Sequence, residues 1–158
     1  MANFKKILMS VLVAAPVVAV AQPGVMNSEA AGYLERGKLM YESHNYVGAI
    51  DQLEHAKQLP ADASLREQAD YYIALSRFER GDEGSLVALQ RFIEQYPASM
   101  FAMEAQMKVG NYYFYRGQWE SALWSYSLVR NRSLDLNSDE DLEYRRAYAA
   151  PACGAGQR

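Results

Sequence analysis

Residues 109–129, VGNYYFYRGQWESALWSYSLV, have the pattern of one complete helical hairpin. Gly110 and Ala122 are small residues, and the large Tyr126 follows Ala122 by four positions. Small residues let two helices cross closely, while large aromatic side chains fill the space around the crossing. Gly117 lies between the two halves, where a helix end favours a residue that accepts positive φ. The segment therefore predicts two antiparallel helices joined by a turn at Gly117.

The same layout returns along the chain at a nearly constant interval. The small residues Gly37, Ala74, Gly110 and Ala147 lie 37, 36 and 37 positions apart. With these residues the chain resembles a tetratricopeptide-repeat protein over residues 28–150, and that family has a period of about 34 residues. The resemblance implies an all-α solenoid of three helical hairpins plus a seventh helix.

The predicted repeat units cover residues 28–62, 63–98 and 99–134, followed by a partial unit at 138–150. In each unit a small residue precedes larger ones at matching positions, which predicts a common packing core. The expected repeat-core residues are Gly37, Ala49, Leu53, Ala74, Ala88, Phe92, Gly110, Tyr113, Ala122 and Tyr126.

Capping residues predict where several helices begin. Asn27 or Ser28 is expected to cap the first helix, and Ser99 the fifth. Ser64 with Glu67 has the spacing of a capping box for the third helix. Alternation with a period of two residues is absent, so no sheet is expected.

Residues 1–21, MANFKKILMSVLVAAPVVAVA, have the form of a secretory signal peptide, with two lysines, a short apolar run and small residues before Gln22. An uncleaved membrane anchor is the alternative, but the run contains Pro16 and is shorter than the roughly 20 residues that span a bilayer. No cysteine follows the run, so lipid attachment is not expected. We expect cleavage near Ala21, a periplasmic or secreted location and no integral membrane span after cleavage.

The segments that flank the repeats are predicted to be irregular. Residues 22–27 have the composition of a short lead-in, and residues 151–158, PACGAGQR, that of a tail in which Pro151 ends the helical pattern. Because the fourth unit has no second helix, we expect the chain to be a truncated form of a longer repeat protein.

The sequence offers little for catalysis or for a cofactor. The 158 residues carry a formal net charge of −3 without a basic stripe, which argues against a nucleic-acid partner. His44 and His55 lack metal-ligand spacing, and Cys153 is the single cysteine. No phosphate-binding glycine loop is present. We therefore expect no metal, no cofactor and no enzymatic activity.

The resemblance to tetratricopeptide repeats implies a binding groove lined by the first helix of each hairpin. Carried over position by position, the expected partner-binding residues are Leu34, Lys38, Tyr41, Gln68, Tyr71, Leu75, Phe78, Met107, Asn111, Phe114 and Tyr115. Some of these large residues are expected to pack between repeats instead. Family members that hold a C-terminal carboxylate pair a lysine with such an asparagine, but Met107 stands at the lysine position before Asn111.

These observations predict a non-catalytic scaffold that binds other proteins or peptides of the cell envelope. Its phrases ADYYIALSRFERGD and VGNYYFYRGQWESAL are similar to the N-terminal part of long periplasmic tetratricopeptide proteins of Bacteroides-like bacteria. The alternatives are the helical, non-catalytic portion of a cell-wall-cleaving enzyme and a fragment of a larger envelope assembly protein. The oligomeric state stays open.

Overall fold

The computed structural model describes residues 23–129 and 136–155, and within these ranges the protein has seven α-helices and no β-strand. The helices are α1 (Pro23–Glu42), α2 (Tyr46–Gln58), α3 (Ala63–Arg80), α4 (Ser85–Gln95), α5 (Met100–Tyr115), α6 (Trp119–Ser127) and α7 (Leu136–Ala155). The expected all-α class is confirmed for the described chain.

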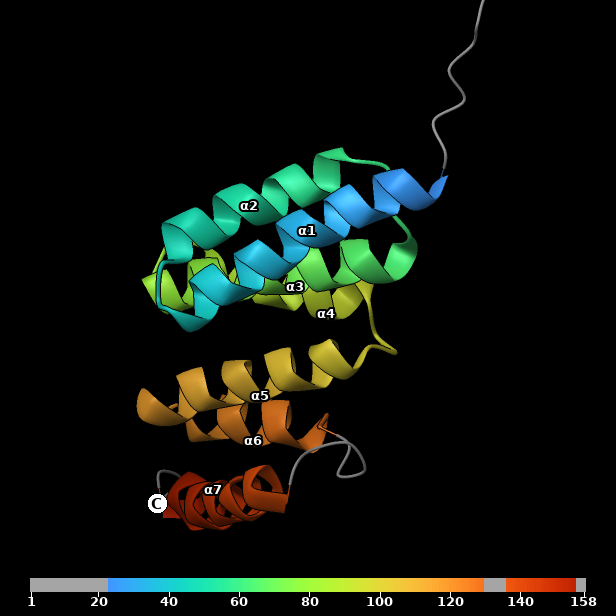
Figure 1. The fold of residues 1–158 in the computed structure, drawn as a ribbon. Helices are drawn as coiled ribbons and strands as arrows, with labels where there is room; N and C mark the ends of the chain where they lie inside the picture. Colours follow the sequence, from blue (N-terminus) through green and yellow to red (C-terminus); the bar gives the residue numbers. More distant parts are fainter. Residues whose placement is uncertain (1–22, 130–135, 156–158) are drawn as a thin grey trace, which may run out of the picture.

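The helices pack in chain order as successive pairs. Each helix contacts the next one along the chain, and α3 also contacts both α1 and α5. Figure 1 shows the pairs α1–α2, α3–α4 and α5–α6 following one another, with α7 at the far end. We call α1, α3, α5 and α7 the first helices, and α2, α4 and α6 the second helices.

Two glycines allow the closest crossings within the pairs. A β-carbon on Gly37 would lie 2.6 Å from Leu53 Cγ, and one on Gly110 would lie 2.3 Å from Tyr126 Cε1. Real β-carbons do not approach heavy atoms this closely, so only glycine fits at either place. The predicted close contact of small and large residues is confirmed in the first and third pairs.

The buried residues form three clusters between successive helices. Most of the expected repeat-core residues are buried, but Ala88 and Tyr113 are only half-buried. Ala147, expected at the crossing of a fourth unit, is exposed because the buried side of α7 carries Leu142 and Ala149 instead. The repeated spacing therefore corresponds to a repeated core in three units and not in the fourth.

The helix ends confirm the expected cap of α5 and correct those expected for α1 and α3, since Asn27 and Ser28 lie inside α1. Ser99 caps α5, and its hydroxyl accepts a hydrogen bond from the Phe101 amide. For α3 the cap is Asp62, whose carboxylate accepts from the Leu65 amide at 2.8 Å, so the capping box expected at Ser64 is wrong. An aspartate two positions earlier starts the helix there because its carboxylate reaches the free amides of the first turn.

Both expected irregular flanks are partly helical. Helix α1 begins at Pro23, four residues before Asn27. Proline suits the first position of a helix because the N–H that it lacks would have no hydrogen-bond partner there. Helix α7 continues through Pro151 to Ala155. Proline removes one hydrogen bond inside that helix without ending it.

The predicted signal peptide at residues 1–21 lies outside the described residues. Among the helices that the structure does describe, none combines the length and apolar character of a membrane-spanning segment.

Candidate docking face on the first helices

A row of polar contacts joins the first helices to one another. The Lys38 ammonium on α1 donates to Gln68 Oε1 on α3 at 2.8 Å, and it also lies 2.9 Å from Glu35 Oε1. The Lys108 ammonium on α5 lies 2.6 Å from Glu79 Oε1 on α3. These contacts connect residues about thirty positions apart in the sequence. They hold three helices of different pairs along one side of the molecule.

The row continues from α5 to α7 through Asn111. Its side-chain oxygen accepts from the Tyr126 hydroxyl and from Arg145 Nη1, each at 2.8 Å. The Arg145 guanidinium also lies over the Tyr115 ring, 5.3 Å from its centre, as in a cation–π contact. Tyr115 is 74% exposed. One amide thus fixes an arginine next to an aromatic ring that stands open to solvent.

Aromatic rings fill the space between α1, α3 and α5. Tyr41 meets Tyr72 edge to face at 5.6 Å, and Tyr71 stacks on Phe101 at 4.8 Å. Such offset and edge-to-face pairs stabilise the packing beyond simple burial. The Tyr71 hydroxyl donates to Glu104 Oε2 at 2.8 Å. The cluster combines apolar surface with a carboxylate at its edge.

Burial changes the acid–base behaviour of this cluster. Burial, with the Glu104 carboxylate as the next cause, raises the pKa of the Tyr71 hydroxyl far above its usual range. Burial likewise raises the pKa of Tyr41 to about 12, assisted by the charge of Glu79. The Tyr71 hydroxyl, which donates to Glu104, therefore keeps its proton to a higher pH than an exposed tyrosine would.

The structure divides the expected groove residues into three groups. Leu34, Tyr71 and Leu75 are at least 95% buried, so they pack between helices and offer almost no surface to a partner. Met107 and Phe114 are half-buried against the cluster between α6 and α7. Tyr41 and Phe78 are likewise half-buried against the hydrophobic clusters, and Lys38, Gln68 and Asn111 are half-buried in polar contacts. Tyr115 is the expected groove residue that is exposed. The side of each first helix that was expected to line a groove also faces the adjacent helix pair. The most apolar side chains on that side are therefore buried between the pairs.

Several residues of this face were not expected from the sequence. Glu79, Glu104, Lys108 and Arg145 each contact a side chain on another first helix. Nothing local marks them, because their partners lie 29 to 34 positions away in the chain. A search for opposite charges or hydrogen-bonding pairs at equivalent positions of adjacent first helices is the sequence signal that would have found them.

The two histidines lie in separate settings. His44 is a turn residue with a φ of 61°, and its Nδ1 lies 3.0 Å from the Tyr46 hydroxyl. His55 lies on the exposed side of α2 beside Tyr33. Across residues 23–129 and 136–155, no three histidine, cysteine or acidic side chains come close enough together to hold a metal ion.

No protein-family model matches the chain, and no curated protein matches it.

Proposed function

We propose that this protein is a non-catalytic scaffold of the cell envelope, a tetratricopeptide-type solenoid that binds a peptide segment of another protein along its first helices. The stacked helix pairs and the glycine crossings support the solenoid. The accessible side chains of α1, α3, α5 and α7 support the choice of binding face.

The observation that carries the proposal is the exposed ring of Tyr115 beside Arg145. Tyrosine and arginine are enriched at protein interfaces, where they supply much of the binding energy. Here the arginine is already positioned by Asn111, so docking orders fewer side chains. A partner peptide would gain an apolar ring face and a guanidinium donor at one place.

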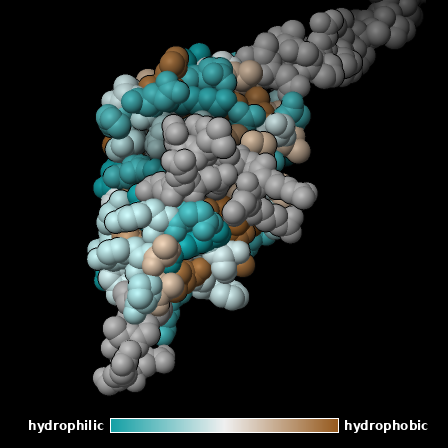
Figure 2. Space-filling view, turned by 90° about the horizontal axis from the view of Figure 1, so that it is seen from below, coloured by the Kyte–Doolittle hydropathy of each residue, from teal (hydrophilic) through white to brown (hydrophobic). Residues whose placement is uncertain are grey.

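Figure 2 views the molecule from the α7 end and shows a few hydrophobic residues among more hydrophilic ones. On α7, Tyr144 and Tyr148 are 65% and 53% exposed, and their ring centres lie 6.3 Å apart. Tyr148 also lies 5.7 Å from Phe114 on α5. The exposed aromatic surface at Tyr115 therefore extends onto α7.

The envelope location rests on the leader at residues 1–21. Fractionation of cells that export the chain, followed by N-terminal sequencing, tests it. The expected mature N-terminus is Gln22. Recovery of an uncleaved chain from the cytoplasm would reject the envelope assignment.

Photo-crosslinking tests the binding face directly. A photoreactive amino acid at position 115 should give discrete crosslinked products with partner proteins. The matched control replaces Val47, which is 64% exposed but lies on the second helix α2. Identical products from both positions would contradict a specific face on the first helices.

The absence of catalysis is a separate part of the proposal. Incubation of the purified chain with peptidoglycan distinguishes a scaffold from the portion of a cell-wall-cleaving enzyme. We expect no soluble muropeptides, and their release would overturn the non-catalytic assignment.

A further inference from the structure

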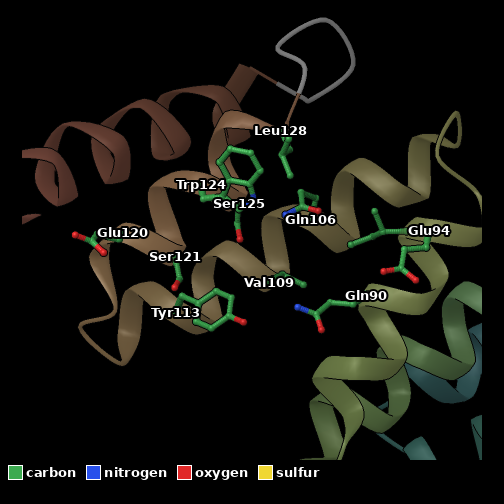
Figure 3. Close-up of a pocket in the computed structure, with 11 residues that line it drawn as sticks. Gln90, Glu94, Gln106, Val109, Tyr113, Glu120, Ser121, Trp124, Ser125 and Leu128 are labelled. Atoms are coloured by element: carbon green, nitrogen blue, oxygen red, sulfur yellow. The ribbon is translucent and has the colours of Figure 1, made fainter.

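On the side of the second helices, a cavity of about 720 Å³ opens between α4 and α6, with α5 as its floor. Figure 3 shows Gln90 and Glu94 of α4 on one side and Ser121 and Trp124 of α6 on the other, with Val109 of α5 between them. The volume is within the range of sites that hold small ligands or a few side chains. This cavity lies apart from the row of contacts on the first helices.

The equivalent place in the preceding repeat is much smaller. Between α2 and α4, above α3, the cavity measures about 280 Å³. Ion pairs cross it, because Lys57 Nζ lies 2.7 Å from Asp70 Oδ1 and Arg77 Nη2 lies 3.3 Å from Glu54 Oε1. Stacking of helix pairs alone therefore does not produce a cavity as large as the one between α4 and α6.

The two cavities differ in charge as well as in volume. The smaller one has Lys57, Arg77 and Arg91 in its lining, whereas the larger one has the carboxylates of Glu94 and Glu120 and no basic side chain. No ion pair joins Glu94 or Glu120 to a basic residue in the described part of the chain. The larger cavity thus carries uncompensated negative charge.

The wall of the larger cavity carries exposed apolar side chains. Trp124 is 68% exposed and Leu128 is 50% exposed, while Val109 is buried beneath them. An exposed tryptophan leaves a large apolar area in contact with water. Tryptophan is also enriched among the interface residues that contribute most of the binding energy. An apolar wall with an acidic rim selects a ligand that is both apolar and basic.

We infer that the cavity between α4 and α6 docks a peptide segment of a partner protein in which a bulky apolar side chain stands beside lysine or arginine. The apolar side chain packs against Trp124 and Leu128. Basic side chains of the segment lie beside Glu94 at one end of the cavity and Glu120 at the other. The amides of Gln90 and Gln106 on the lining offer hydrogen bonds to the peptide backbone. Charge complementarity steers such a segment to this side of the molecule.

A peptide probe tests the inference on the purified full chain. The probe is a fluorescent peptide in which lysines alternate with leucine and phenylalanine. One control peptide replaces every lysine by glutamate, and a second replaces every apolar residue by serine. We expect binding by fluorescence anisotropy for the first peptide and at least about tenfold weaker binding for both controls. Equal binding of the glutamate peptide would overturn the inference.

Tryptophan fluorescence reports whether the probe reaches the cavity. The chain has two tryptophans, so the Trp119→Phe variant leaves Trp124 as the single reporter. Bound peptide should shift its emission to shorter wavelength and protect it from acrylamide quenching. If the same protection instead appears without peptide and grows with protein concentration, the cavity is occupied by a second copy of the chain and the inference is wrong.

Substitutions separate this site from the first-helix face. Trp124→Ala should weaken probe binding by about tenfold or more, and the double change Glu94→Gln with Glu120→Gln by about threefold to tenfold, less so in high salt. Val47→Ala and Glu83→Gln alter an exposed apolar residue and an exposed carboxylate outside both binding sites, so probe binding should stay unchanged. Unaltered binding in the Trp124 and glutamate variants, with helicity retained by circular dichroism, would reject the site without affecting the proposal for Tyr115.

Discussion

Gly110 and Tyr126 form the tightest crossing of the third helix pair, since a β-carbon on Gly110 would lie 2.3 Å from Tyr126 Cε1. Tyr126 is fully buried, and its ring lies across the glycine of the neighbouring helix. The ring has little room to retreat because protein interiors are packed as densely as organic crystals.

Gly110→Ala should therefore destabilise the protein although alanine is the better helix former. We expect the free energy of unfolding to fall by about 1–3 kcal/mol, the usual cost of overpacking a core. Urea unfolding followed by circular dichroism measures the change.

Gly32→Ala is the matched control in α1. Its added β-carbon would lie 3.5 Å from Arg36 Nη1, an ordinary contact with the end of a flexible side chain. Alanine should then stabilise the chain by up to about 1 kcal/mol through helix propensity. Equal effects of the two substitutions would contradict the steric reading of Gly110.

Asn111→Ala should loosen the junction of α5, α6 and α7. The Asn111 oxygen accepts from both Tyr126 and Arg145, so alanine removes two hydrogen bonds, one of them with a charged donor. The expected loss is about 1–3 kcal/mol. Asn111→Asp keeps an acceptor for both donors and should cost less than half as much. If the two variants are equally unstable in urea, the hydrogen bonds are not the cause.

Asp62→Ala tests the observed start of α3. Loss of the cap on the Leu65 amide should cost about 1 kcal/mol. Ser64→Ala, which removes the residue that the sequence favoured, should change the unfolding free energy by less than about 0.5 kcal/mol, as for most exposed substitutions. The opposite order of effects would restore Ser64 as the cap.

Alkaline pH should destabilise the fold through its partly buried tyrosines Tyr41 and Tyr96. Burial and the hydrogen bond to Asp70 raise the pKa of Tyr96 to about 12, and burial raises that of Tyr41 to about 12, from a usual value of 10.0. Because the folded pKa is higher than the unfolded one, this stabilisation is present in full below pH 10 and is lost as the pH rises towards 12.

Urea unfolding at several pH values measures that loss. The Tyr96→Phe variant should show a shallower decline between pH 10 and 12 than the parent chain, since one of the shifted groups is gone. Lysine titration affects the unfolding free energy of both chains equally, so it cancels when the two curves are subtracted. Parallel curves would show that Tyr96 is not one of the groups responsible.

Tyr115→Ala separates binding from stability. The side chain is 74% exposed, so the free energy of unfolding should change by less than about 0.5 kcal/mol. Capture of the crosslinked partners should fall by about fivefold or more, as for a tyrosine at the centre of an interface. A stable variant with undiminished capture would place the docking surface elsewhere.

The binding face was only partly predictable from the sequence. Tyr115 was expected in the groove and is accessible, whereas Leu34, Tyr71 and Leu75 were expected there and are buried. Position within a repeat tells which stripe of a helix points towards its neighbours. It does not tell which side chains of that stripe the adjacent helix covers, since the coverage depends on how closely the helices approach.

The cavity between α4 and α6 was not predictable at all. Trp124 has the apolar character of a core residue and lies two positions before Tyr126, which is fully buried. Side chains two positions apart on a helix, such as Trp124 and Tyr126, point in different directions. Only the placement of α4 decides that Trp124 is exposed to solvent.

The sequence by itself determined the helical class, the start of α5 after Ser99, the turn at Gly117 and the glycine crossings at Gly37 and Gly110. These follow from local spacing and from steric limits that act over a few turns. Only the tertiary structure decided which carboxylates are paired, which groove residues are buried and where a cavity remains. Those outcomes depend on contacts between side chains about thirty positions apart, whose distances no local pattern sets.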